Sequence, residues 1–75
     1  MEFINIDRQK ERELLGERIT NIRKEKGISL AELSERTGIK ESSILRIEEG
    51  KFSVNCDVLA SIAEAMGCYI SLSNK

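Results

Sequence analysis

Apolar residues recur along this chain with the spacing of amphipathic helices. Within residues 8–26, Leu15, Ile19 and Ile22 stand at i, i+4 and i+7 and form one apolar stripe. Apolar residues also follow helical spacing in residues 30–37, in residues 41–49 and after Asn55. A glycine ends each of these segments, at Gly27, Gly38, Gly50 and Gly67. The pattern predicts four short helices, with Gly16 allowing a close neighbour or marking where the first becomes regular.

The residues at the start of the second helix agree with this division. Ser29 is a natural N-cap, and Glu32 three positions later completes a capping box. Ile28 and Leu33 occupy the positions of a hydrophobic staple. Residues 29–51 therefore predict two short helices joined by a tight turn, which is the arrangement of a helix-turn-helix.

The last residues change to a period of two, which predicts a β-strand over residues 68–73. A strand needs a partner, either residues 1–7 or the same strand of a second subunit; a frayed tail is the alternative. Residues 1–7 themselves read as a short strand, an apolar arm or a loose terminus. A strand-paired dimer would use Cys68, Tyr69, Ile70 and Leu72.

Length and composition indicate one globular domain, residues 1–75. A chain this short has a marginal core, so association with a second copy is a plausible source of stability. No apolar run approaches the roughly 20 residues of a membrane span, and no basic leader precedes an apolar stretch. The net charge of −1 argues mildly against nucleic-acid binding, although the placement of the charges matters more.

The chemistry-bearing residues do not indicate an enzyme. The chain has no histidine and only two cysteines, Cys56 and Cys68, whose spacing fits no zinc motif. We expect two small buried thiols in a reducing compartment, no metal and no cofactor. Glu41, Glu48 and Glu49 are interpreted as solvated charges and not as a catalytic set.

Residues 15–67 resemble the Cro/phage-repressor-type helix-turn-helix domain of the XRE family. The matching stretches are Leu-Gly-Glu-Arg-Ile (15–19), Ile-Arg-Lys-Glu-Lys-Gly-Ile-Ser (22–29), Ala-Glu-Leu-Ser-Glu-Arg-Thr-Gly-Ile (31–39), Ile-Leu-Arg-Ile-Glu-Glu-Gly-Lys (44–51) and Leu-Ala-Ser-Ile-Ala-Glu-Ala-Met-Gly (59–67). The resemblance implies an all-α, lambda-repressor-like bundle of four or five helices. Its recognition helix would cover about residues 40–49. It also implies a cytoplasmic protein of bacterial or phage origin.

The resemblance also implies site residues. It pairs Arg23 with Glu48 in a structural ion pair. It places seven residues at the DNA: Ser29, Lys40, Glu41, Ser42, Ser43, Arg46 and Lys51. Arg46 is the best candidate for guanine, because its two-pronged donor matches O6 and N7. Lys40, Lys51 and the first turn after Ser29 suit phosphates.

The sequence departs from the family at three places. Leu30 stands where relatives commonly have glutamine, Lys40 replaces a polar cap, and residues 52–54 lack basic residues. These departures suggest weak non-specific affinity or a site read mainly as a dimer.

The leading hypothesis is a sequence-specific transcriptional regulator that binds double-stranded DNA as a homodimer. The resemblance leaves open an antitoxin or autorepressor role with a partner toxin. The alternative is a protein-interaction module on the same scaffold, whose apolar surface would comprise Leu30, Leu45, Phe52 and Tyr69.

Overall fold

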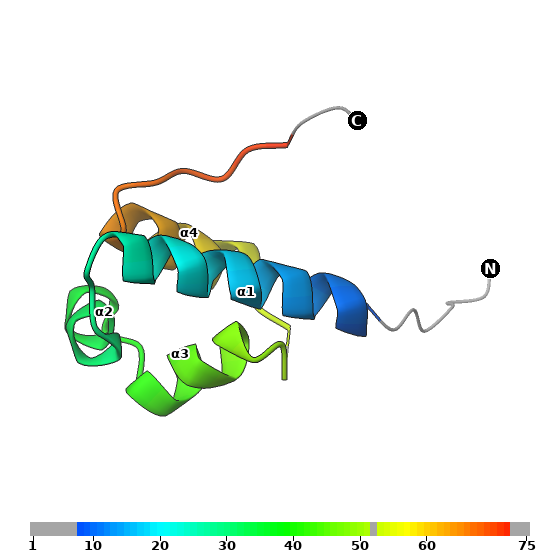
Figure 1. Cartoon of the computed structure of the whole chain (residues 1–75), viewed down its shortest axis with the longest axis horizontal. Helices are drawn as coiled ribbons and strands as arrows, with labels where there is room; N and C mark the ends of the chain where they lie inside the picture. Colours follow the sequence, from blue (N-terminus) through cyan, green and yellow to red (C-terminus); the bar gives the residue numbers. More distant parts are fainter. Residues whose placement is uncertain (1–7, 52, 73–75) are drawn as a thin grey trace.

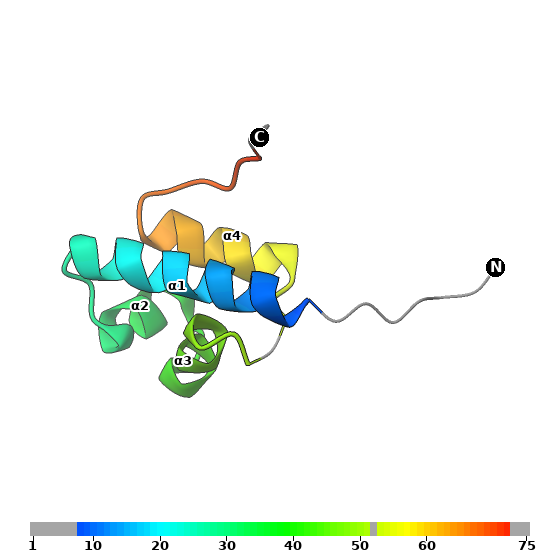
Figure 2. The same ribbon diagram turned by 45° about the vertical axis from the view of Figure 1, so that its right-hand side comes forward.

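The protein, described by a computed structural model over residues 8–51 and 53–72, is a bundle of short helices (Figure 1). The helices of these residues are α1 (Gln9–Glu25), α2 (Leu30–Thr37), α3 (Glu41–Glu48) and α4 (Cys56–Ala65). Two views show α1 and α4 side by side, with α2 and α3 on one side of that pair (Figures 1 and 2). The predicted all-α fold and its four helices are confirmed.

The local signals in the sequence set the helix ends. The Ser29 hydroxyl accepts a hydrogen bond from the Glu32 amide at 3.0 Å, as the capping box predicts. The Asn55 side chain likewise accepts from the Val58 amide at 2.8 Å. Gly38 ends α2 in the left-handed conformation at φ 76°, which an L side chain rarely adopts. These caps satisfy amides and carbonyls that a helix end leaves open.

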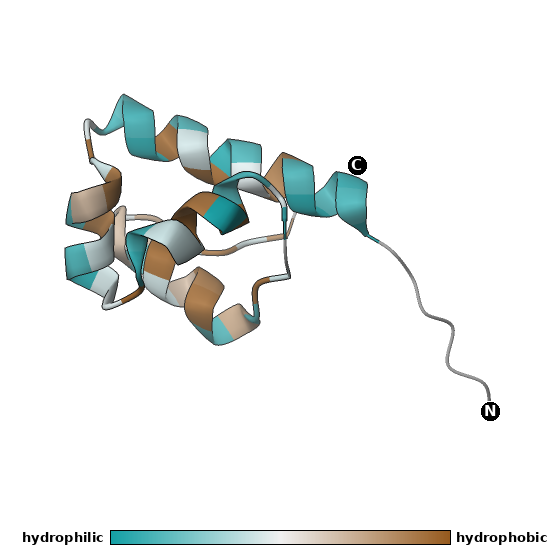
Figure 3. Cartoon of the chain, turned by 90° about the horizontal axis from the view of Figure 1, so that it is seen from below, coloured by the Kyte–Doolittle hydropathy of each residue, from teal (hydrophilic) through white to brown (hydrophobic). Residues whose placement is uncertain are grey.

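The core lies where the four helices meet. Leu33 of α2, Ile44 of α3 and Ile62 of α4 are fully buried, and Ile19 of α1 is nearly so. Each such side chain contributes about 1.5–3 kcal/mol by leaving water. The side of the helices that faces away from the core is more polar, and Figure 3 shows that much of the outer side of α1 is hydrophilic. The amphipathic spacing in the sequence therefore corresponds to the buried face of each helix.

Gly16 lets α1 lie directly against the end of α3. A Cβ at this position would stand 2.3 Å from the Glu48 carbonyl oxygen and 2.5 Å from that of Ile47. The close neighbour expected as one reason for this glycine is thus the backbone of α3. The contact matters for function because it fixes the orientation of α3 on the rest of the bundle.

The predicted strand over residues 68–73 does not form in residues 68–72, and this part of the prediction is wrong for the single chain. The physical reason is that, within residues 8–51 and 53–72, no strand lies beside the segment to accept its hydrogen bonds. After the Cys68 amide bonds to the Ala63 carbonyl at 2.8 Å, the chain continues as a tail above α1 and α4 (Figure 1). Ser73 and the expected arm of residues 1–7 lie outside the described residues.

A search of the described helices finds none that is both long and apolar enough to span a membrane.

Candidate nucleic-acid interface

The helices α2 and α3 carry the residues that were predicted from the sequence to contact DNA. Three residues, Gly38 to Lys40, connect the two helices, and α2 packs against α3. The outer side of α3 faces away from α4 and the C-terminal tail (Figure 1). An exposed second helix that packs on the first helix is the geometry that allows entry into the major groove.

The two faces of α3 differ sharply. Ile44 and Ile47 point into the core, with 0% and 4% of their surfaces exposed. Leu45 and Arg46, which stand between these two isoleucines in the sequence, are exposed. Ser42, about one turn before them, is exposed as well. Helical periodicity therefore turns one set of side chains inward and leaves the other set free to contact a ligand.

The seven predicted DNA contacts are not equally accessible. Six are exposed on the caps of α2 and α3, the outer face of α3 and the residue beyond it: Ser29, Lys40, Glu41, Ser42, Arg46 and Lys51. Ser43 is half-buried, so it has less surface to offer. The set is therefore distributed over the N-caps of α2 and α3, the body of α3 and the turn that follows α3.

The N-termini of α2 and α3 are capped differently. The Ser29 side chain caps α2 through the Glu32 amide, which leaves its hydroxyl hydrogen for another acceptor. Lys40 occupies the N-cap of α3 without a side-chain hydrogen bond to the helix. A positive side chain and an uncapped first turn both favour an anion at the start of α3.

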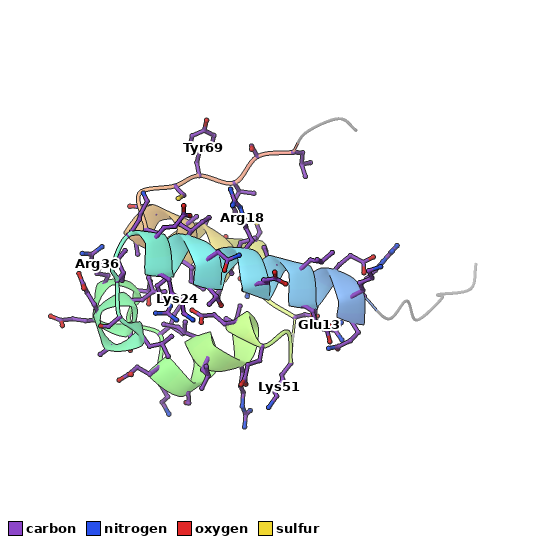
Figure 4. All side chains as sticks on the ribbon, in the orientation of Figure 1. Glu13, Arg18, Lys24, Arg36, Lys51 and Tyr69 are labelled. Carbon is purple, nitrogen blue, oxygen red and sulfur yellow. The ribbon has the colours of Figure 1, made fainter. Side chains whose placement is uncertain are left out.

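The turn after α3 determines where Lys51 lies. Gly50 adopts φ 71°, and the turn is closed by a 2.9 Å hydrogen bond from the Lys51 amide to the Arg46 carbonyl. This turn also brings the Lys51 ammonium to 3.4 Å from a Glu49 carboxylate oxygen. Figure 4 shows Lys51 projecting away from the bundle on the α3 side.

Sequence reasoning missed the role of Glu49. The spacing from Glu49 to Lys51 is two residues, which does not bring side chains together on a regular helix. The pair forms across the left-handed turn at Gly50, where the helix has ended. Glu49 therefore competes with any phosphate for Lys51.

Arg23 and Glu48 form a two-pronged ion pair beneath the recognition helix. Arg23 donates from Nε to Glu48 Oε2 at 2.7 Å and from Nη2 to Oε1 at 3.0 Å. A third donor, Nη1, reaches the Ile28 carbonyl at 3.0 Å. The side chains are 11% and 4% exposed, so the pair is largely removed from water.

The pair has an electrostatic consequence for the surface. The hydrogen bond to Glu48 raises the pKa of Arg23, partly opposed by burial and assisted by the charge of Glu48. Because Glu48 is turned inward to this partner, it adds little negative charge to the outer side of α3. That side then presents three cations, Lys40, Arg46 and Lys51, against the carboxylates of Glu41 and Glu49.

The described residues contain no group of three or more His, Cys, Asp or Glu that could hold a metal ion.

Comparison with known proteins agrees with this geometry. The sequence profile of the family described as "Helix-turn-helix domain" matches residues 16–68. No curated protein sequence matches the chain. A crystal structure of the clp gene regulator ClgR from Corynebacterium glutamicum superimposes with a TM-score of 0.77 and 32% identity, covering 79% of this chain and 76% of that one.

Two further solved structures show the same fold. Another crystal structure of ClgR gives a TM-score of 0.75 and 33% identity over 77% of this chain and 62% of that one. An HTH_3 family transcriptional regulator from Vibrio cholerae gives a TM-score of 0.75 and 25% identity. That match covers 80% of this chain but 34% of the Vibrio protein, which is a much longer chain.

Fold, profile and geometry together define the class as helix-turn-helix proteins of the XRE type, which are DNA-binding transcriptional regulators and typically not enzymes. The chain belongs to the helix-turn-helix domain family, because the profile covers more than half of its length.

Proposed function

We propose that this protein is a sequence-specific regulator that binds duplex DNA as a dimer, with α3 in the major groove. The observation that carries the proposal is the outer face of α3, where Ser42 and Arg46 are exposed and flanked by Lys40 and Lys51. Arg46 would donate to guanine O6 and N7. The lysines and the first turns of α2 and α3 would hold phosphates and so fix the helix in the groove.

The remaining residues of the face have smaller roles. Ser42 would donate to a base or phosphate, and the half-buried Ser43 would contribute at most one hydrogen bond. Glu41 would accept from cytosine N4 or exclude other bases by repelling their acceptors. Because only one net positive charge faces the DNA, affinity for random sequence should be weak. Two copies acting together would raise it.

The C-terminal tail supports a dimer. Tyr69, Ile70 and Leu72 are 86%, 45% and 100% exposed, so much apolar surface remains uncovered in the single chain. Beneath the tail, α1 and α4 leave an apolar groove of about 320 Å³. Pairing with the tail of a second copy would supply the missing hydrogen bonds of the strand and cover these side chains. Both the autorepressor and the antitoxin roles would use such a dimer, and both would act in the cytoplasm.

The interaction-module hypothesis is less well supported by the positions of its residues. Leu30 is half-buried and packs against the core, so it offers little surface. Tyr69 projects from the side of the molecule opposite to α3, which carries Leu45 (Figures 1 and 4). Phe52 lies outside the described residues. The described members therefore do not make one apolar patch, which a protein partner would require.

The test is a titration of the purified protein onto DNA from upstream of its own gene, compared with unrelated DNA at about 50 mM salt. We expect retention of the upstream DNA and its loss in Arg46→Ala. Lys10→Ala also removes one positive charge, from an exposed position of α1 that does not line the groove beneath the tail, and should bind normally. Absence of any retained DNA, even with the dimer cross-linked, would reject the proposal in favour of the interaction module.

A further inference from the structure

We infer that Leu45 reads a thymine, by packing against its 5-methyl group beside the base that Arg46 contacts. The inference rests on the DNA binding proposed above and adds a base preference to it. Leu45 is 42% exposed and lies in α3, between the buried Ile44 and the exposed Arg46. Thymine is the base that presents a methyl group in the major groove, where an apolar side chain recognises it.

The position of Leu45 suits this contact. It follows Ser42 by three residues, so the two share one face of α3. Side chains of a helix lean toward its N-terminus, which carries the tip of Leu45 over the turn that contains Ser42. Since the N-terminal part of a recognition helix lies nearest the base edges, the leucine methyls would enter the groove and not face the backbone.

The surroundings of Leu45 argue against a protein partner at this place. Its neighbours at i−4, i−3, i+1 and i+4 are all polar or charged and exposed, namely Glu41, Ser42, Arg46 and Glu49. The apolar residues of α3, Ile44 and Ile47, are turned into the core. A single leucine surrounded by polar groups does not form a docking patch. It does match a methyl group surrounded by hydrogen-bonding base edges.

The same chemistry predicts that Leu45 distinguishes thymine from the other bases. Against a base edge that offers only donors or acceptors, Leu45 would remove water without replacing its hydrogen bonds. Against thymine, the leucine covers an apolar group. Removing one methyl group from this contact should weaken binding by about fourfold, which corresponds to the transfer free energy of one buried CH₂ group.

The experiment uses uracil, which is thymine without the methyl group. Duplexes that bind the parent protein are selected from a random pool at about 50 mM salt, and each thymine of the selected sequence is then replaced in turn by uracil. We expect one position in each half-site to lose about fourfold in affinity. In Leu45→Ala the same replacement should have no effect, while changes at the guanine should still weaken binding.

Leu14→Ala is the matched control. Leu14 is 57% exposed on α1, so the variant also removes an exposed leucine, yet it should keep the parent's sensitivity to uracil. Two results would overturn the inference and leave DNA binding intact: uracil tolerated at every position by the parent, or sensitivity retained in Leu45→Ala. If the parent selects no DNA at all, the proposed function fails together with the inference.

Discussion

At the scale of single residues, Arg23 and Glu48 decide how firmly α3 is held. Arg23 connects three elements, since it donates to Glu48 at the end of α3 and to the Ile28 carbonyl before α2. Removing one partner of such a pair leaves the other charge buried without compensation. The ion pair thus holds in place the helix that we propose reads DNA, while its own side chains are largely buried.

Arg23→Ala should lower the free energy of unfolding by about 3–5 kcal/mol. For a domain of this size, that loss lowers the thermal midpoint by more than about 10 °C, measured by circular dichroism. Lys24→Ala, on the exposed neighbouring residue, should change stability by no more than about 0.5 kcal/mol. A thermal midpoint of Arg23→Ala equal to that of the parent would refute the structural role.

The ion pair should give little pH dependence through the arginine. A raised pKa in the folded state stabilises the fold below the pKa of the unfolded state, and this contribution is lost only as pH rises through the folded value. For arginine both values lie far above neutrality. The pair therefore stays charged on the Arg23 side at every pH where DNA binding would be measured.

Glu49→Gln should strengthen DNA binding. The carboxylate of Glu49 pairs with Lys51 at 3.4 Å, and neutralising it frees the ammonium for phosphate and removes a repulsive charge. Both side chains are exposed, so we expect only a few-fold increase in affinity, measured by fluorescence anisotropy with a labelled duplex.

Glu17→Gln makes the same charge change at an exposed position of α1 that does not line the groove beneath the tail, and serves as the control. If both variants raised affinity equally, the effect would come from net charge and not from the release of Lys51.

At the scale of elements, the position of α3 depends on its crossing with α1. Alanine in a helix interior is usually more stable than glycine by about 1 kcal/mol. At Gly16 the added methyl would collide with two carbonyl groups of α3, which cannot move without shifting the helix. The glycine is therefore needed for packing and not for a turn.

Gly16→Ala should destabilise the fold by about 1–3 kcal/mol, because overpacking outweighs the gain in helix propensity. The measurement is chemical denaturation of both proteins under the same conditions. Glu17→Ala, on the adjacent exposed position, should be nearly neutral. A more stable Gly16→Ala protein would mean that α3 does not lie against α1 at this residue.

Elements with local signals could be predicted from the sequence almost to the residue. Ser29, Glu32 and Gly38 are each close in the chain to the helix ends that they define, so α2 needed no tertiary information. The outward direction of Arg46 followed from helical periodicity.

Other features depend on distant parts of the chain or on another chain. The pairing of Glu49 with Lys51 depends on a turn, and the closeness of Gly16 to Glu48 depends on helix packing. A strand in the tail depends on a partner, so its periodicity alone was not sufficient to predict it.

At the scale of the whole molecule, α3 and the C-terminal tail lie on opposite sides of the bundle (Figure 1). Joining two copies through their tails would therefore leave α3 of each copy uncovered. A dimer would also bury the apolar side chains that the single chain exposes around residues 69–72.

The dimer predicts a solution mass of twice the 8.5 kDa of one chain, measured by sedimentation equilibrium at micromolar concentration. Ser71→Pro removes a backbone donor from the exposed tail and should shift the protein toward monomer. Ser71→Thr keeps the donor and should remain dimeric. A parent protein of monomer mass at high micromolar concentration would count against tail pairing.

The central claim, that the α2–α3 face binds the DNA backbone and reads bases, is tested most directly by the salt dependence of affinity for a selected duplex. Two lysines from each of two copies should give a slope of log K against log salt of about −3.6. Lys40→Ala or Lys51→Ala should each reduce its magnitude by about 2 in the dimer. An affinity that is independent of salt, or slopes unchanged in both variants, would contradict the account.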